Sequence, residues 1–299
     1  MASIQQIKRL ITSVKSTEQI TRAMKMVAAA KLRRAQERIL AARPFADKLA
    51  EMIQSLARRA ERLSHPLMEA RPVERRLLVA VTSDKGLCGS YNTNIVRVMA
   101  EEMSGRAEAQ DGAPEVSLVS IGKKGRDVAL HRGYPIQKEF IDNFGRMDYG
   151  LAKSLGDYFI AEFTEGRADE VVLVYNRFIS TLSQRVTVET LLPISPLKAE
   201  GVEAGAEAAG AETDFIYEPS PEVVLEKLID RHLYTHMHRV ILDADASEHG
   251  ARMTAMENAS RNAKDMIGSL TLLYNRTRQA KITTELIEVV LRTAGCRQL

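Results

Sequence analysis

The sequence predicts a protein of mixed α/β class, in which long N- and C-terminal helices pair as an antiparallel coiled coil and an α/β domain with a mostly parallel sheet lies between them. Three observations support this prediction. A heptad pattern runs without a skip through the first 56 residues, a second helical pattern fills residues 221–299, and the middle alternates apolar runs with amphipathic stretches. The 299 residues allow about two domains with a real core.

The N-terminal helix is expected over residues 1–62. No Gly precedes Gly86, and positions spaced alternately by three and four residues are mostly apolar. This spacing keeps one stripe on one face of a helix, which then needs a partner helix of similar length. Pro44 is expected to kink the helix or to restart it. The stripe consists of Ile4, Ile7, Ile11, Val14, Glu18, Thr21, Lys25, Ala28, Leu32, Ala35, Ile39, Ala42, Ala46, Leu49, Ile53 and Leu56.

The C-terminal helix is expected over residues 221–299. Between residues 251 and 294 there is no Pro and one Gly, and the heptad stripe is apolar as far as Tyr274 and mostly polar beyond it. If Leu56 lies opposite the start of this helix, equal rise places Ile4 near residue 270 and leaves about 25 residues without a partner in this chain. The stripe consists of Met253, Met256, Ser260, Ala263, Ile267, Leu270, Tyr274, Thr277, Lys281, Thr284, Glu288 and Leu291.

The expected unpaired end of this helix is apolar on nearly all sides. Leu286, Ile287, Val289, Val290 and Leu291 surround it. A helix that is apolar all round is normally buried. Because nothing in this chain is left to cover the end, we expect another protein to cover it.

An α/β domain is expected over residues 73–195. Apolar runs at 77–81, 116–121, 171–175 and 185–191 predict strands, and helices are expected at 91–104, 124–132 and 147–165. Strands that alternate with helices indicate a Rossmann-like layer with a mostly parallel sheet. The acidic, Gly/Ala-rich stretch 199–213 then predicts a flexible linker over 196–220.

Charge is unevenly distributed along the chain. Residues 1–76 hold 17 Lys and Arg against 7 Asp and Glu, a net charge of +10, whereas the whole chain carries +3. A basic end suits nucleic acid, an anionic membrane surface or an acidic protein partner, and the sign does not choose among them. No apolar run reaches the roughly 18 residues of a membrane span, and no secretory signal or disulfide framework is expected.

The loop Thr82–Gly89 follows a strand, where ligands bind in α/β proteins. A P-loop needs its lysine after the second glycine, whereas Lys85 precedes both glycines here. We therefore prefer a tight packing turn and keep a phosphate site as the alternative. Cys88 has no nearby base in the sequence and is interpreted as a small buried filler rather than a nucleophile. The motif residues of the loop are Asp84, Lys85, Gly86, Cys88 and Gly89.

Three further patterns leave alternatives open. Gly122–Gly125 resembles the GXXG loop of RNA-binding KH domains, although a basic turn explains it as well. His232 and His236, with His238 nearby, have the i, i+4 spacing of zinc ligands without an obvious third ligand, so a polar helix face is preferred. Methionines at the helical seam fit gap-filling packing or an adaptable partner contact. They are Met24, Met26, Met253 and Met256.

Motifs at both ends and in the middle resemble the gamma subunit of F-type ATP synthases. The family's N-terminal run is similar to Ile20–Leu32, and its TSD(K/R)GLCG turn with the following N-x-N is similar to Thr82–Asn94. The family closes its signature with Gly-Ala where this chain has Arg292 and Thr293. The matches cover nearly the full chain and are together highly specific. Those in the C-terminal helix are Ala251–Met256, Leu272–Arg276, Arg278–Ala280 and Ile282–Glu285.

The resemblance implies the central rotor shaft of a bacterial ATP synthase, with no catalytic site, cofactor or metal of its own. The coiled coil would stand inside a ring of three alpha and three beta subunits. The α/β domain would contact the epsilon subunit and the membrane c-ring, peripheral to the cytoplasmic face of the plasma membrane. Such a shaft couples proton-driven c-ring rotation to sequential conformational change in the beta subunits, and no nucleic-acid partner is expected.

Seven residues are assigned by this resemblance to contacts with the alpha and beta subunits. They are Met24, Lys25, Arg252, Arg278, Gln279, Thr283 and Glu285. A KH-like RNA-binding protein and a phosphate-binding α/β protein are the alternatives at this point.

Overall fold

The computed structural model describes residues 3–59, 65–104, 114–142, 147–194 and 221–295, so the expected linker 196–220 lies outside the described residues. The chain forms two compact units, one of Ala29–Arg252 and the other of Met1–Ala28 with Met253–Leu299. The elements, in order, are α1 (Ile4–Arg59), the short 3₁₀ helix η1 (Pro66–Met68), β1 (Arg75–Val81), α2 (Tyr91–Ser104), β2 (Glu115–Ile121), α3 (Lys123–Arg132), β3 (Ile136–Phe140), α4 (Tyr149–Thr164), β4 (Glu170–Phe178), β5 (Gln184–Leu192) and α5 (Pro221–Gly295).

The helix α1 begins with a capping box. The Ser3 hydroxyl accepts from the Gln6 N–H at 3.2 Å, and the Gln6 side chain accepts from the Ser3 N–H at 2.9 Å. The helix continues through Pro44, so a restart there is excluded. Proline removes one backbone hydrogen bond, and burial of Ala35 and Leu49 on either side favours the helix despite that loss.

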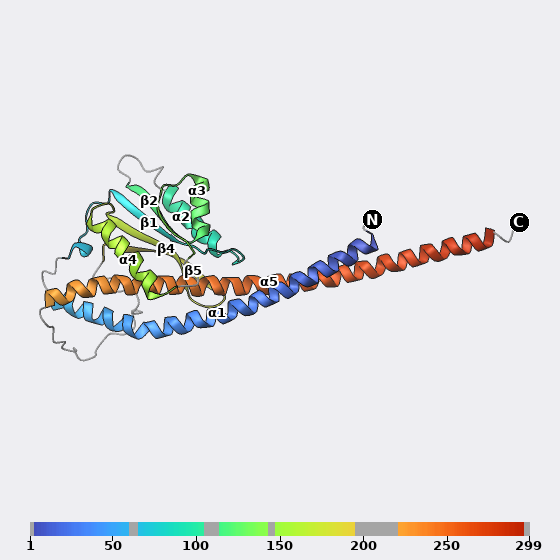
Figure 1. Ribbon diagram of the computed structural model, residues 1–299, viewed down its shortest axis with the longest axis horizontal. Coiled ribbons are helices and arrows are strands. Elements are labelled where there is room, and N and C mark those ends of the chain that lie inside the picture. Colours follow the sequence, from blue (N-terminus) through green and yellow to red (C-terminus); the bar gives the residue numbers. More distant parts are fainter. Residues whose placement is uncertain (1–2, 60–64, 105–113, 143–146, 195–220, 296–299) are drawn as a thin grey trace. The chain divides into compact units, whose positions relative to one another are not determined.

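The sheet has the strand order β3-β2-β1-β4-β5, in which only the pair β4–β5 is antiparallel (Figure 1). The expected Rossmann-like, mostly parallel layer is therefore confirmed. The edge strand β3 escaped prediction because two of its five residues are apolar and its three middle residues are exposed.

The two faces of the sheet carry separate apolar cores. Alternate residues of β1 point to opposite faces, as in any strand. Leu77, Val79 and Val81 join the core that α4 and α5 cover, whereas Leu78 and Ala80 join the core that α2 and α3 cover.

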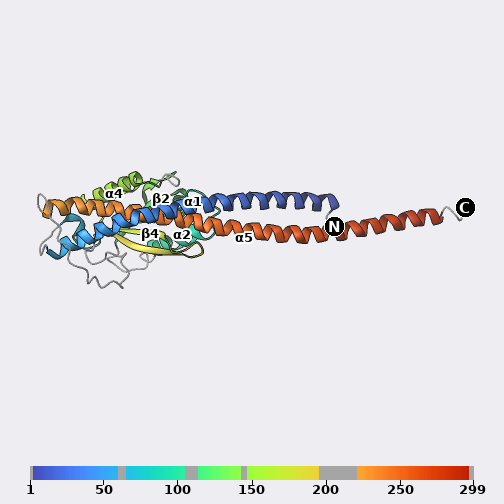
Figure 2. The same ribbon diagram turned by 90° about the horizontal axis from the view of Figure 1, so that it is seen from below.

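The first part of α5 packs on the sheet at helical spacing. Its residues in that core are Ile229, Leu233, Met237, Val240, Ile241 and Ala244. The helix α4 approaches α5 closely at Gly156, where an added Cβ would lie 2.4 Å from the Tyr234 ring. The part of α1 in the same unit runs beside α5, and Leu32, Ala35 and Leu49 are buried (Figure 2).

The smaller unit is an antiparallel pair formed by the first turns of α1 and the last turns of α5. Lys25 on α1 and Glu257 on α5 form an ion pair at 3.1 Å. Every position of the expected heptad stripe from Ile4 to Ile53 is buried or half-buried, which confirms the stripe in both units. On α5 the stripe is covered as far as Thr277.

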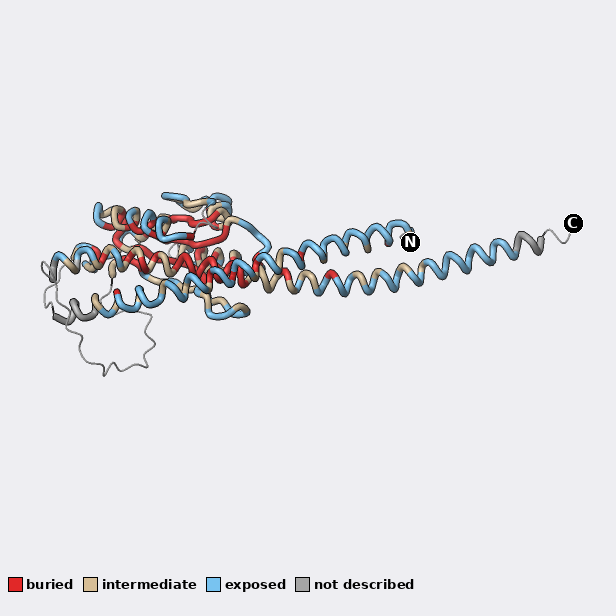
Figure 3. Tube along the Cα trace, turned by 60° about the horizontal axis from the view of Figure 1, so that its bottom comes forward, coloured by how far each residue is buried: buried red, intermediate tan, exposed pale blue. Residues whose placement is uncertain are grey.

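The register of this pair differs from the expected one. Moving 21 residues back from Lys25 to Ile4 moves about 21 residues forward from Glu257, which places Ile4 opposite about residue 278 rather than 270. The difference arises because Leu56 does not lie level with the start of α5. Every residue from Arg278 to Val290 is exposed, so the uncovered end is shorter than expected but begins where the stripe loses its apolar character (Figure 3).

Among the described residues, no helix combines the length and the apolar character that crossing a membrane requires.

Candidate partner-contact sites

Met24 and Lys25 lie on α1 within the smaller unit, where both are half-buried. The Lys25 ammonium, 3.1 Å from the Glu257 carboxylate, and the neighbouring Arg261 lower the pKa of Glu257 by hydrogen bonding. The side chain of Lys25 is 39% exposed. An exposed pair of this kind is weak, so the Lys25 ammonium can exchange partners at low cost.

The uncovered end of α5 carries the other expected contact residues. Arg278, Gln279, Thr283 and Glu285 are all exposed. The Thr283 hydroxyl donates to the Gln279 carbonyl at 3.0 Å within the helix, and Glu285 pairs with Lys281 at 3.6 Å. These contacts are local to the helix and leave the outer surface of the four residues open to solvent.

Large apolar side chains are interspersed with these polar ones. Ile282 is 48% exposed, Leu286 60% and Ile287 54%. The described part of this end therefore presents apolar groups around its circumference together with hydrogen-bonding groups. Such a surface is typical of a protein interface. The side chains of Arg292 and Thr293 lie outside the described residues.

The loop Thr82–Gly89 is held by internal hydrogen bonds in the larger unit. The Asp84 carboxylate accepts from the N–H groups of Lys123 at 3.1 Å and Asp142 at 3.2 Å. Gly89 has a left-handed φ of +57°, which favours glycine at this position. The structure thus favours a packing turn over a phosphate cradle, because these backbone and carboxylate groups already have partners.

The Gly122–Gly125 turn packs against the same loop. Gly122 has φ +96°, and an added Cβ would lie 2.0 Å from the Thr82 carbonyl oxygen. A Cβ on Gly125 would lie 2.8 Å from the Thr82 hydroxyl, which accepts from the Gly125 N–H at 2.8 Å. Both glycines are therefore explained by close packing between two strand ends, without an RNA backbone.

Cys88 is a buried filler, as expected from the sequence. Its thiol accepts from the Asn92 side-chain amide at 3.2 Å, and burial raises its pKa. A raised pKa disfavours the thiolate that a nucleophile requires.

Arg252 and Gly86, which belong to two different sequence motifs, lie together in the structure. The Arg252 guanidinium donates to the Gly86 carbonyl at 3.2 Å and to the Glu248 carboxylate at 2.5 Å. Glu248 precedes Arg252 by four residues, a spacing that supports such pairs on one helix face. Arg252 is thus an expected contact residue whose guanidinium is held on the Thr82–Gly89 loop of its own unit.

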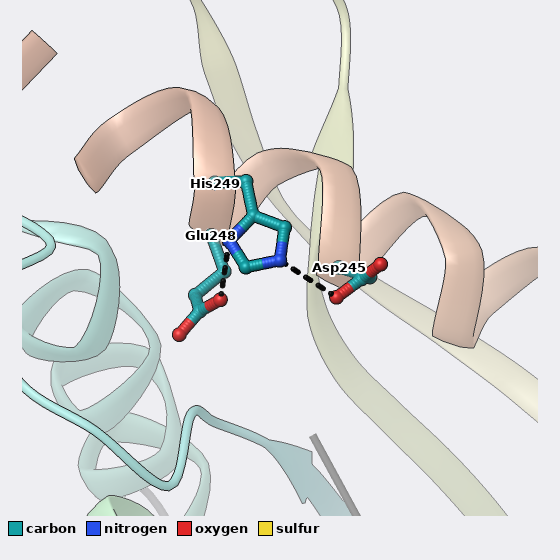
Figure 4. A group of neighbouring side chains, drawn as sticks. All are labelled: Asp245, Glu248 and His249. Carbon is teal, nitrogen blue, oxygen red and sulfur yellow. Dashed lines mark ion pairs between the residues drawn. The ribbon is translucent and has the colours of Figure 1, made fainter. Parts of the chain in front are cut away.

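A buried cluster beside Arg252 was not predicted from the sequence. His249 Nε2 lies 3.3 Å from Asp245, and His249 Nδ1 lies 3.1 Å from Glu248 (Figure 4). The three residues could be considered as metal ligands. However, the two ring nitrogens face different carboxylates and Arg252 occupies Glu248, so one ion cannot bind all three groups in this arrangement. The i, i+4 spacings of Asp245–His249 and Glu248–Arg252 were the available signals.

The zinc alternative at the other histidines is also not favoured. His236 Nε2 lies 2.9 Å from the Glu189 carboxylate on β5, and burial lowers the pKa of His232 to about 4. His236 therefore already has a buried partner. The preferred polar helix face is in fact half-buried, because α5 packs on the sheet there.

Comparisons with known proteins agree on one family. A family model described as ATP synthase matches residues 3–293. The chain is 44% identical over 290 residues to the ATP synthase gamma chain of Geobacter sp. (strain M21), with 97% of each chain covered. It is 43% identical over 299 residues to that of Chlorobaculum parvum, with 100% of each covered.

Two solved structures have a similar fold. One is a chain of the Tetrahymena thermophila mitochondrial ATP synthase central stalk and c-ring, with 25% identity, a TM-score of 0.55, and coverage of 81% of this chain and 99% of that one. The other is a chain of the Euglena gracilis mitochondrial ATP synthase in rotational state 3. It has 22% identity, a TM-score of 0.68, and coverage of 98% and 94%.

Proposed function

Because this chain belongs to the ATP synthase gamma chain family, we propose that it is the central rotor stalk of a bacterial F-type ATP synthase, with no catalytic site of its own. The observation that best supports the proposal is the uncovered end of α5. Residues 278–290 are exposed on every side although Ile282, Leu286 and Ile287 are apolar. This end needs an enclosing partner, which a ring of alpha and beta subunits would supply.

The proposed action is mechanical. A shaft made of two unlike helices is not threefold symmetric, so each beta subunit in a ring of three meets a different face. A contact shifts the conformational equilibrium of a subunit only through its differential affinity for the states. Turning the shaft would therefore favour different states of the nucleotide sites in order, as ATP synthesis requires.

The contacts should be many and individually weak. Lys25 is 39% exposed and pairs with a Glu257 side chain that is 32% exposed, and Glu285 pairs with an exposed Lys281. Exposed pairs contribute about 0–1 kcal/mol each, so they can be exchanged for pairs with a partner as the shaft turns. The net charge of +10 in residues 1–76 would favour acidic surfaces on the beta subunits.

The remaining partners follow from the same family assignment. We propose that the α/β domain contacts the epsilon subunit and the c-ring, and that proton flow through the membrane sector turns the shaft. The chain would then be peripheral to the cytoplasmic face of the plasma membrane.

Copurification from the native source tests the proposal. A tagged full chain should recover alpha and beta subunits in a 3:3:1 ratio with it. A matched variant with Leu286→Ser and Ile287→Ser should recover less of both, whereas Leu130→Ser, an equally exposed apolar residue on α3 (64%), should recover the wild-type amount. Failure of the wild-type chain to recover any nucleotide-binding subunit would contradict the proposal.

A further inference from the structure

We propose that His249 is a positioning residue for Arg252: when neutral it helps to hold the Arg252 guanidinium on the Thr82–Gly89 loop, and when protonated it loosens that hold. The consequence for subunit contacts rests on the proposed function. The switch itself is a property of the chain and can be tested without partners.

His249 lies where three charged groups meet. Its Nε2 faces Asp245 at 3.3 Å, and its Nδ1 lies within reach of both the Glu248 carboxylate at 3.1 Å and the Arg252 guanidinium at 3.4 Å. His249 is 7% exposed, Asp245 7% and Glu248 3%. Interactions among groups this buried are screened little by water, so a change of one charge is felt by its neighbours.

Neutral His249 has one proton to donate and one nitrogen that can accept. With the proton on Nε2, the ring donates to Asp245, and Nδ1 can accept from the Arg252 Nη1. The other terminal nitrogen of Arg252, Nη2, donates to Glu248 and to the Gly86 carbonyl. In this state the guanidinium has partners on His249, Glu248 and the loop.

Protonated His249 cannot accept from Arg252. Both ring nitrogens become donors, so Nδ1 donates to Glu248 at 3.1 Å, and a second cation then lies 3.4 Å from the guanidinium. Glu248 is shared between two cations, and one partner of Arg252 becomes a source of repulsion. The bond from Arg252 to Gly86 is therefore weakened when the ring gains a proton.

The surrounding groups do not share this behaviour. Burial raises the pKa of the Tyr91 phenol and of the Cys88 thiol, so both stay neutral in the range where histidines ordinarily titrate. The titratable and charged groups around His249 are Asp245, Glu248 and Arg252 on α5, Tyr91 at the start of α2, and Cys88 in the β1–α2 loop.

Loosening of Arg252 has one consequence for the proposed function. A guanidinium that leaves Gly86 becomes available to an acidic group of a partner subunit. Acidification would thus strengthen the contact of this part of the shaft with its partner, and His249→Gln would remove the pH dependence.

Chemical modification of arginine tests the switch in the full chain. Phenylglyoxal is applied at about pH 8 and about pH 6, which span the ordinary range of histidine. Modification of Arg252 is quantified by mass spectrometry relative to Arg33, an 83% exposed arginine whose reactivity corrects for the pH dependence of the reagent. The Arg252/Arg33 ratio should rise about threefold on acidification, the factor that corresponds to loss of one weak polar contact.

Two variants isolate the cause. The His131→Gln variant, which alters an exposed histidine on α3, should show the same rise as the wild type. The His249→Gln variant should show a constant ratio. A constant ratio in the wild type, or an equal rise in His249→Gln, would overturn the proposal.

A second readout uses the wild-type chain alone, in case the variant does not fold. The NMR signal of the His249 ring Cε1–H reports its protonation, and its midpoint should coincide with that of the Arg252 modification curve. Midpoints that differ would contradict a causal link. If the switch is observed but no nucleotide-binding subunits copurify with the chain, the proposed function fails and the switch stands.

Discussion

Gly122 offers a sharp test of why the loop Thr82–Gly89 and the Gly122–Gly125 turn have their sequences. The backbone of Gly122 has φ +96° and ψ 149°, a region that only glycine adopts readily. In Gly122→Ala the new Cβ would lie 2.0 Å from the Thr82 carbonyl oxygen, where no real Cβ is found. Gly133→Ala is the matched control, because Gly133 also has a positive φ, +71°, but no atom within 4 Å of the added Cβ.

The expected magnitudes follow from these two geometries. A non-glycine residue at positive φ costs about 1 kcal/mol in the left-handed region and up to about 3 kcal/mol in the region of Gly122. Relief of the contact with the Thr82 carbonyl requires the ends of β1 and β2 to separate, which adds about 1–3 kcal/mol. We therefore expect Gly122→Ala to lower the free energy of unfolding by about 3–5 kcal/mol and Gly133→Ala by about 1 kcal/mol.

Amide hydrogen exchange measures this difference in the full chain. Peptides from β1 and β2 report the free energy of opening of the sheet, free of any contribution from the terminal helices. Gly122→Ala should accelerate exchange in both strands far more than Gly133→Ala does. Equal protection in the two variants would refute the close-packing explanation and would reopen a ligand-binding role for the turn.

Three other perturbations have defined outcomes. Gly156→Ala places a Cβ 2.4 Å from the Tyr234 ring and should lower the free energy of unfolding by about 2 kcal/mol, measured by urea denaturation; an unchanged midpoint would contradict the contact. Burial raises the pKa of Asp243 from 3.8 to about 6, so its contribution to stability is present below about pH 4 and is lost as the pH rises through about 6. Asp243→Asn should therefore be more stable than the wild type at pH 8, by at most about 3 kcal/mol, and similar to it at pH 4; equal denaturation midpoints at both pH values would contradict the assigned burial cost. Leu286→Ser combined with Ile287→Ser should change the unfolding free energy of the isolated chain by less than about 0.5 kcal/mol, because both side chains are exposed, yet should weaken assembly about tenfold or more in a copurification assay; normal assembly would show that this surface is not an interface.

Much of the architecture was predictable because it depends on periodicity. The heptad stripe of α1 needs only a spacing of three and four residues, and each of its described positions from Ile4 to Ile53 is buried or half-buried. The central strands β1, β2 and β4 are continuous apolar runs because both faces are covered. The strand β3 was missed because an edge strand with exposed Gln137, Lys138 and Glu139 carries no such run.

The register of the coiled coil and the buried cluster were not predictable from periodicity. A heptad stripe is compatible with registers that differ by seven residues, and the Lys25–Glu257 pair selects one of them. Asp245, Glu248 and His249 have the composition of a solvated helix face, and they are buried because the β1–α2 loop and α2 cover them. The signal lay in the pairing of charges at i, i+4, which surface helices share.

ATP-driven rotation of single complexes tests the central claim most directly. A fluorophore is attached to a cysteine introduced by Lys153→Cys on the exposed face of α4, and the purified complex is fixed to a surface through its nucleotide-binding subunits. The account predicts that on addition of ATP the label turns in one direction, in three equal steps per revolution. A label that stays fixed relative to the other subunits while ATP is hydrolysed would contradict it.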